Sequence, residues 1–226
     1  MLWHDLLFMH WPVPAGALRP LIPPSLTLET YDGAAWLGVV PFRMSGVRPR
    51  LVPPLPWLSA FPELNVRTYV TAGGKPGVWF FSLDAANPVA VEAARLGFHL
   101  PYYTARMVCE PEGEGIRYES ERTHRGAPPA ALRMRYRPTG RAYRSTPGTL
   151  EHWLTARYCL YAADRRGHTW RCEIDHPPWP LQPAEAAIEH NTMAEPIGLQ
   201  LAAPPALLHF ARYQEVVAWL LERVPG

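Results

Sequence analysis

The segment from Phe61 to Val70 carries three polar side chains that alternate with apolar ones. Glu63, Asn65 and Arg67 are two residues apart, the spacing that places side chains on one face of a β-strand. A carboxyl group can transfer a proton, and a guanidinium group can bind an oxyanion. Exposed strands show the same alternation, but the apolar neighbours are typical of a buried strand. In a closed barrel one strand face lines the interior, so we expect these three residues to mark a cavity.

Other candidate chemistries lack the residues that they need. Cys159, His168, Cys172 and His176 are close in sequence but form neither a C-x-x-C nor an H-x-x-x-H unit, so we expect ordinary strand residues and no metal. The segment 73–77 (GGKPG) has no Ser or Thr after its lysine, so it is typical of a turn rather than of a phosphate-binding loop. The sequence also contains no G-x-S-x-G nucleophile motif.

Five arginines fall within residues 133–144, with two tyrosines between them. Such a stripe can bind nucleic acid. However, alternate arginines of the segment 132–137 share one strand face, and Glu119 and Glu121 share a face of the preceding segment 116–122. Charge pairing between neighbouring strands explains this pattern without a ligand. The net charge of +2 likewise favours neither nucleic acid nor an anionic membrane as a partner.

Proline makes up 27 of the 226 residues, more than twice the usual share of roughly 5%. Because proline breaks helix interiors, an all-helical bundle is excluded. The proline-rich segment 48–56 is flanked by apolar residues, so we expect an ordered loop there rather than a linker. We therefore expect one domain that spans residues 1–226.

The cysteine count and the N-terminus both indicate a cytoplasmic protein. Three cysteines are too few for a disulfide framework, and an odd number is typical of reduced thiols. The first residues, MLWHDLLFMHWPVP, have no cationic region and make a poor signal peptide. No stretch reaches the roughly 18 uninterrupted apolar residues of a membrane span.

Hairpin signals dominate the chain, and helix signals are few. The expected strand pairs are 63–70 with 77–84, 116–122 with 132–137, and 157–163 with 168–175. The expected helices are short and cover about 14–21, 87–97, 149–154 and 183–191. This pattern predicts a mainly β (α+β) fold, with a curved or closed antiparallel sheet and a few short outer helices.

Several segments carry a further signal as a set: HWPVPAGALRPLIPPSL, YDGAAWLGVVPFRM, FPELNVRTYV, GKPGVWFFSLDA, FHLPYY, LEHWLTARYCLY and HPPWPLQPAE. Together they resemble the YqjF-like family of bacterial proteins, and the similarity covers nearly the whole chain. That family is similar to a branch of the acetoacetate decarboxylase-like superfamily. The resemblance implies a curved β-barrel around a central pocket with short outer helices, which agrees with the hairpin pattern.

The resemblance also assigns positions to individual residues. Segment 61–66 (FPELNV) matches an aromatic-x-Glu strand of the superfamily and places Glu63 at its pocket glutamate. His4-Asp5 stands where the superfamily has an Arg-Glu pair, and its second pocket glutamate falls near Val40 and is absent. These departures put the superfamily's chemistry in doubt for this chain.

The segment 95–103 decides the matter, because in the superfamily it carries the lysine that forms a Schiff base. Arg95 and the proline are retained, but Tyr102 and Tyr103 replace both lysines. A phenol cannot form an imine. Lys75, the only lysine of the chain, falls in the expected turn 73–77. We therefore exclude decarboxylation through a Schiff base.

We expect the barrel to bind a small molecule with a carbonyl or carboxylate group in a central pocket, without a cofactor. With Glu63 as base and Tyr102 as hydrogen-bond donor, the protein would be a lyase- or isomerase-like enzyme. Two alternatives are open: a non-catalytic ligand-binding or sensing module, and a scaffold with an interior ion-pair network. A homo-oligomer is compatible with the sequence. The expected ligand-binding side chains are His4, Asn65, Arg67, Arg95, His99 and Tyr103.

Overall fold

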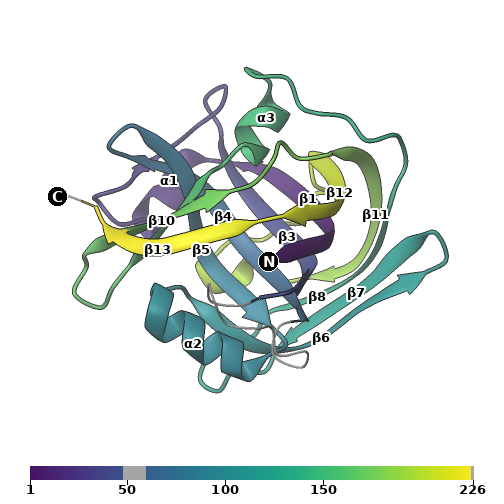
Figure 1. Ribbon diagram of the computed structural model, residues 1–226, viewed down its shortest axis with the longest axis horizontal. Coiled ribbons are helices and arrows are strands. Elements are labelled where there is room, and N and C mark those ends of the chain that lie inside the picture. The colour runs from purple at the N-terminus through teal and green to yellow at the C-terminus, as the bar shows by residue number, and fades with distance from the viewer. Residues whose placement is uncertain (48–59, 225–226) are drawn as a thin grey trace.

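The computed structural model describes residues 1–47 and 60–224 (Figure 1). The segment 48–56, expected to be an ordered loop, lies outside these ranges. In chain order the elements are β1 (Leu2–Val13), α1 (Ala15–Leu18), the 3₁₀ helix η1 (Arg19–Leu21), β2 (Thr27–Leu28), β3 (Ala35–Ser45), β4 (Phe61–Ala72), β5 (Lys75–Ala85), α2 (Pro88–Phe98), β6 (Tyr102–Glu112), β7 (Gly115–Arg122), β8 (Ala131–Pro138), α3 (Leu150–Thr155), β9 (Cys159–Ala163), β10 (Thr169–Asp175), β11 (Gln182–Asn191), the 3₁₀ helix η2 (Glu195–Ile197), β12 (Leu207–Glu215) and β13 (Val217–Arg223).

The strand pairings run around a ring. From β4 the ring continues through β5, β6, β7, β8, β11, β12, β1 and β3, and β3 pairs with β4 again. The shortest pairing of this ring is between β11 and β12, which share two residue pairs. One edge of β5 pairs with β4, and the other is shared by β6 and β9, both parallel to β5. The expected mainly β fold with a curved, nearly closed and mostly antiparallel sheet is therefore confirmed.

The hairpin of β4 and β5 has a tighter turn than the sequence predicts. Gly73 and Gly74 alone form it, with φ values of 57° and 73°. Both angles lie in the left-handed region, where glycine is favoured and which a two-residue hairpin turn requires. Lys75 already belongs to β5 and pairs with Ala72. The other two expected hairpins are also present, as β7 with β8 and β9 with β10.

Three of the four expected helices are present. In α2 the side chain of Asn87 accepts hydrogen bonds from the amides of Val89 and Ala90, at 3.0 and 3.1 Å, as an N-cap does. The helix continues through Gly97 and ends at His99, whose φ of 53° is left-handed. His99 therefore takes the terminating position that the sequence assigns to Gly97.

The helix expected over 183–191 is wrong, because these residues form β11. Alanine and glutamate favour helices when other forces are absent. Here Ala184, Ala186 and Ile188 are two residues apart and pack on the ring interior, while the residues between them are exposed. Pairing with β8 and burial at period two outweigh the helix propensity.

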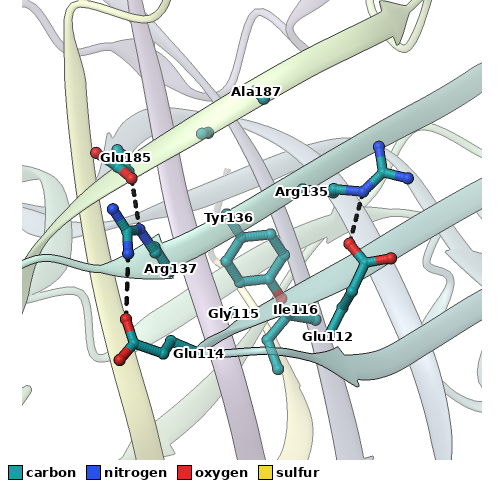
Figure 2. Close-up of a pocket in the computed structure, with 10 residues that line it drawn as sticks. Glu112, Glu114, Gly115, Ile116, Arg135, Tyr136, Arg137, Glu185 and Ala187 are labelled. Carbon is teal, nitrogen blue, oxygen red and sulfur yellow. Dashed lines mark hydrogen bonds and ion pairs between the residues drawn. The ribbon is translucent and has the colours of Figure 1, made fainter.

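Arg135 and Arg137 of β8 form ion pairs with glutamates of β6 and β11 (Figure 2). Arg135 lies 2.6 Å from Glu112, and Arg137 lies 2.5 Å from Glu185. These pairs line an open hollow of about 520 Å³. Charge pairing on this face is present, but the expectation that Glu119 and Glu121 are the partners of the β8 arginines is wrong. Glu119 and Glu121 pair with Arg117 and Arg106.

The interior of the ring is filled by apolar side chains. Leu7 of β1 and Leu64 and Val66 of β4 belong to one buried cluster with Tyr118 of β7 and Met134 of β8. These strands stand on opposite sides of the ring, so the side chains meet inside it. The barrel centre is therefore a packed core.

The polar side chains of β4 point away from that core. Glu63, Asn65 and Arg67 alternate with the interior residues, and their neighbours on β3 and β5 belong to two other clusters or directly adjoin them. Those clusters include residues of α2, α3, β9 and the segment 176–181, which form an outer layer. The expectation that these three residues line a pocket at the barrel centre is therefore wrong. We call the face of β1, β3, β4, β5 and β12, together with the start of β6, that lies beneath this outer layer the covered face.

Candidate functional site

Glu63 and Tyr102 meet on the covered face. Tyr102 begins β6, which pairs with the end of β5, and β5 pairs with β4 beside Glu63. The Tyr102 hydroxyl donates a hydrogen bond of 2.8 Å to Oε2 of Glu63. From α2, the Arg95 guanidinium donates a bond of 2.6 Å to the Tyr102 carbonyl and holds the start of β6. The expected proximity of Glu63 and Tyr102 is confirmed, and Arg95 supports the backbone of this pair.

Burial controls the protonation of both groups. Glu63 is 3% exposed, and removal from water raises the pKa of its carboxyl to about 8. The hydrogen bond from Tyr102 lowers this pKa, and the charge of Asp84 raises it. Burial and Glu63 together raise the pKa of the Tyr102 phenol well above its usual value. At neutral pH the pair is thus mainly a carboxylic acid and a phenol.

Tyr103 belongs to a different site on the other side of the sheet. Adjacent residues of a strand point to opposite faces, so Tyr103 points to the ring interior. Its ring centre lies 4.2 Å from the guanidinium carbon of Arg122. Arg122 binds both carboxylate oxygens of Asp84 at 2.7 Å, and both side chains are fully buried. The structure therefore does not place Tyr103 with Glu63.

Asn65 and Arg67 continue the covered face beyond Glu63. Both are buried, with 4% and 7% exposure. Oδ1 of Asn65 and Nε of Arg67 have no hydrogen-bond partner within residues 1–47 and 60–224. Buried polar atoms normally have a partner, either a protein group, a water or a ligand. These two side chains therefore have polar atoms free to bind a group that residues 1–47 and 60–224 do not supply.

His4 and His99 lie elsewhere. His4 shares a contact of 2.7 Å with Ser45 Oγ and packs its ring edge-on against the exposed Tyr213. His99 packs against Trp170, with ring centres 5.7 Å apart, and lines an open hollow of about 550 Å³. The structure brings neither histidine to Glu63.

Two buried histidines of the covered face were not predicted from the sequence. His10 of β1 is fully buried, and its Nε2 lies 2.6 Å from the hydroxyl of Tyr69. His209 of β12 is also buried, with Nε2 3.5 Å from Glu151. Burial lowers the pKa of both histidines, so both are neutral at neutral pH. A histidine inside the apolar run of residues 6–11 was the available signal, but only the pairing of β1 with β3 and β12 reveals its neighbours.

The only lysine of the chain lies away from Glu63. Lys75 lies at the turn end of the β4–β5 hairpin and forms an ion pair with Glu173, whereas Glu63 lies at the open end. The described residues contain no group of three or more His, Cys, Asp or Glu side chains arranged for a metal. No helix in the same part of the chain is long and apolar enough to cross a membrane.

Several solved structures share this architecture. An acetoacetate decarboxylase matches with a TM-score of 0.67 and 10% identity, covering 99% of this chain and 88% of that one. An acetoacetate decarboxylase-like enzyme from Sphingomonas wittichii RW1 matches at 0.63, with 14% identity and coverage of 100% and 92%. The enduracididine biosynthesis enzyme MppR, complexed with pyruvate, matches at 0.62, with 11% identity and coverage of 99% and 89%. The protein thus has an acetoacetate decarboxylase-like fold.

Sequence comparison defines the family. The model of DUF2071, an uncharacterized conserved protein, matches residues 1–215. The uncharacterized protein YqjF of Bacillus subtilis (strain 168) is 45% identical over 221 residues, which cover 98% of this chain and 90% of that protein. The chain therefore belongs to the DUF2071 family.

Proposed function

We propose that the protein binds a small carbonyl compound on its covered face and that Glu63 and Tyr102 form an acid–base pair there. The observation that carries this proposal is the hydrogen bond of 2.8 Å between the Tyr102 hydroxyl and a carboxyl group whose pKa is about 8. Groups with pKa values near the working pH are the most effective in proton transfer. The family resemblance also places Tyr102 at the Schiff-base lysine position of the superfamily.

Each group has a defined task in such a reaction. The protonated form of Glu63 can donate a proton or a hydrogen bond to a carbonyl oxygen, and its ionised form can remove a proton from the neighbouring carbon. Tyr102 keeps its proton, since its pKa is raised well above the usual value, and it stabilises the ionised form of Glu63 by donation. These steps belong to lyase- or isomerase-like chemistry that needs no imine. The solved MppR complex with pyruvate shows that a related fold accommodates a small carbonyl compound.

A second candidate function is a structural scaffold with an interior ion-pair network. The buried pair of Asp84 and Arg122, with Tyr103 against it, favours this reading for the ring interior. On the covered face, by contrast, Arg67 is a buried charged group with no ion pair in the described residues, and Nδ1 of His10 and Oδ1 of Asn65 have no hydrogen-bond partner there. We therefore assign the scaffold role to the interior pair and the ligand to the covered face.

The test uses a panel of small ketones, aldehydes and keto acids. Binding is measured by calorimetry, and exchange of protons next to the carbonyl with deuterium is followed by ¹H NMR. We expect Tyr102→Phe to weaken binding by about 1 kcal/mol or more, the scale of a lost buried hydrogen bond. Glu63→Gln removes the titrating group and should abolish the exchange.

Tyr103→Phe is the matched control, because Tyr103 points to the opposite face and should leave binding and exchange unchanged. Binding without exchange would contradict the enzyme and support a ligand-binding or sensing module. Equal affinity in Tyr102→Phe and the unsubstituted protein would show that Tyr102 is only a core residue. Absence of binding across the panel would favour the scaffold.

The wider setting of this function is also a proposal. We infer one domain over residues 1–226 that acts in the cytoplasm, where its three free cysteines would stay reduced. The partner is a small molecule rather than nucleic acid or membrane. Trp219 and Leu220 of the edge strand β13 are 44% and 84% exposed, which is compatible with a homo-oligomer. Light scattering during gel filtration would measure the oligomeric state.

A further inference from the structure

Three arginines of the described chain are buried: Arg67, Arg122 and Arg157. Arg122 is paired with Asp84, and Arg157 lies 2.5 Å from a carboxylate oxygen of Glu29. A buried charge is strongly unfavourable unless a partner compensates it, so these two pairs are the usual arrangement.

Arg67 is the exception. It forms no ion pair or hydrogen bond with any of residues 1–47 and 60–224, and its guanidinium only lies against two aromatic rings, 5.2 Å from the centre of Phe8 and 5.8 Å from that of Tyr69. The remaining residues, 48–59 and 225–226, contain no Asp or Glu. No side-chain carboxylate of this protein therefore neutralises Arg67.

A glycine lies between Arg67 and a buried histidine. His10 of β1 and Arg67 of β4 flank Gly38 of β3 on the covered face. A Cβ atom at Gly38 would lie 3.3 Å from Cγ of Arg67 and 3.3 Å from Cδ2 of His10. The glycine thus leaves room for the two side chains to meet above it.

His10 carries a second unpaired polar atom on the covered face. Its pKa is held well below the usual value by burial, by Arg67 and by His209, so the ring is neutral. When Tyr69 donates its hydroxyl proton to Nε2 across the 2.6 Å contact, the ring proton is on Nδ1. Nδ1 is buried and has no partner within the described residues. The ring atoms of His10 nearest to Gly38 are Cδ2 and Nε2, so the unpaired Nδ1 is on the side of the ring away from that glycine.

We propose that the Arg67 guanidinium, with the neutral ring of His10 beside it, binds the carboxylate of a small monocarboxylic acid. One formal positive charge, with a neutral histidine beside it, is balanced by one negative charge, which a carboxylate supplies and a phosphate dianion exceeds. The planar guanidinium matches the planar carboxylate through two parallel hydrogen bonds. Glu151 is the acidic group beside His209. It contacts the His209 ring, and the described residues show no ion pair between Glu151 and Arg67. The site does not depend on Glu63 and Tyr102 as an acid–base pair.

The test titrates sodium acetate and inorganic phosphate into the protein at constant ionic strength, with binding followed by calorimetry. We expect acetate to bind more tightly than phosphate. Arg67→Met keeps the length of the side chain and removes its charge, and it should weaken acetate binding about tenfold or more. Arg106→Met, at a position whose side chain is 72% exposed, is the control and should bind acetate normally.

Each result has a clear meaning. Unchanged acetate binding by Arg67→Met, or no acetate binding by the unsubstituted protein, would overturn the site, and preference for phosphate would overturn its carboxylate class. Without acetate, Arg67→Met should melt at the same or a higher temperature than the parent, because it no longer buries an unpaired charge.

A second measurement needs no variant. Crystals soaked in iodide should show an anomalous peak beside the Arg67 guanidinium, and its absence there would contradict the proposal. Tyr102→Phe should bind acetate like the parent protein. A loss of carbonyl binding in that variant with normal acetate binding would separate the two proposals.

Discussion

The Tyr102 hydroxyl and the Glu63 carboxyl form a hydrogen bond of 2.8 Å, which connects β6 with β4 although these two strands are not neighbours in the sheet. β5 lies between them, and both side chains reach across it on the covered face. A second tyrosine secures the same residue from the ring interior, since the Tyr118 hydroxyl donates a bond of 2.7 Å to the Glu63 carbonyl. Glu63 is therefore held on both sides of the sheet, which fixes its carboxyl for chemistry.

The stability of the protein should depend on pH through Glu63. Its pKa is about 8 in the folded state and 4.5 in the reference state, so the folded protein binds the proton more tightly. This stabilisation is complete below about pH 4.5 and is lost as the pH rises to about 8. Glu63→Gln lacks this titrating group and should not show the loss. Between about pH 4.5 and pH 8, the free energy of unfolding of the variant should therefore rise relative to that of the parent by about 2 kcal/mol or more. Urea unfolding at a series of pH values measures the difference, and a constant offset between the two proteins would contradict it.

The interior pair of Asp84 and Arg122 should contribute much more to stability than a surface pair. Arg122→Met leaves the buried carboxyl of Asp84 without its partner and should cost about 3–5 kcal/mol in the free energy of unfolding. The matched change at the surface, Arg106→Met, removes the exposed ion pair with Glu121 and should cost less than about 1 kcal/mol. Equal losses in chemical denaturation would show that Asp84 and Arg122 are not the buried pair described here.

Imine chemistry should be absent. Lys75 is ion-paired with Glu173 at the turn end of the hairpin, away from Glu63. Treatment with acetoacetate and borohydride should therefore leave Lys75 without a covalent adduct when the protein is analysed by mass spectrometry. Detection of a reduced adduct on Lys75 would overturn the exclusion of a Schiff base. An acetoacetate decarboxylase that retains its lysine is the positive control.

Local patterns in the sequence were sufficient for most of the fold. Alternation in 63–70 predicted β4, and the paired glycines predicted the turn that follows it. Alternation was also present in 183–191, but alanine and glutamate there favoured a helix, and only pairing with β8 decided for β11. Local propensity fails where a distant strand determines the outcome.

The candidate site could be predicted in part. Periodicity placed Glu63, Asn65 and Arg67 on one face, and the family resemblance brought Tyr102 to Glu63. Which side of the sheet faces the core depends on how all strands close, and this lies beyond any local pattern. For the same reason His10 was missed, because its neighbours come from strands far away in sequence. The adjacent tyrosines Tyr102 and Tyr103 were expected together, although a strand must point them to opposite faces.

The central claim is that Glu63 is a buried acid that is neutral at neutral pH and hydrogen-bonded to Tyr102. A ¹³C NMR titration of glutamate side-chain carboxyls, with Glu63→Gln to assign the resonance, measures this most directly. We predict a midpoint of about 8 for Glu63, and a higher midpoint in Tyr102→Phe, because the lost hydrogen bond no longer favours the ionised form. A midpoint near the reference value of 4.5, or one that Tyr102→Phe leaves unchanged, would contradict the account.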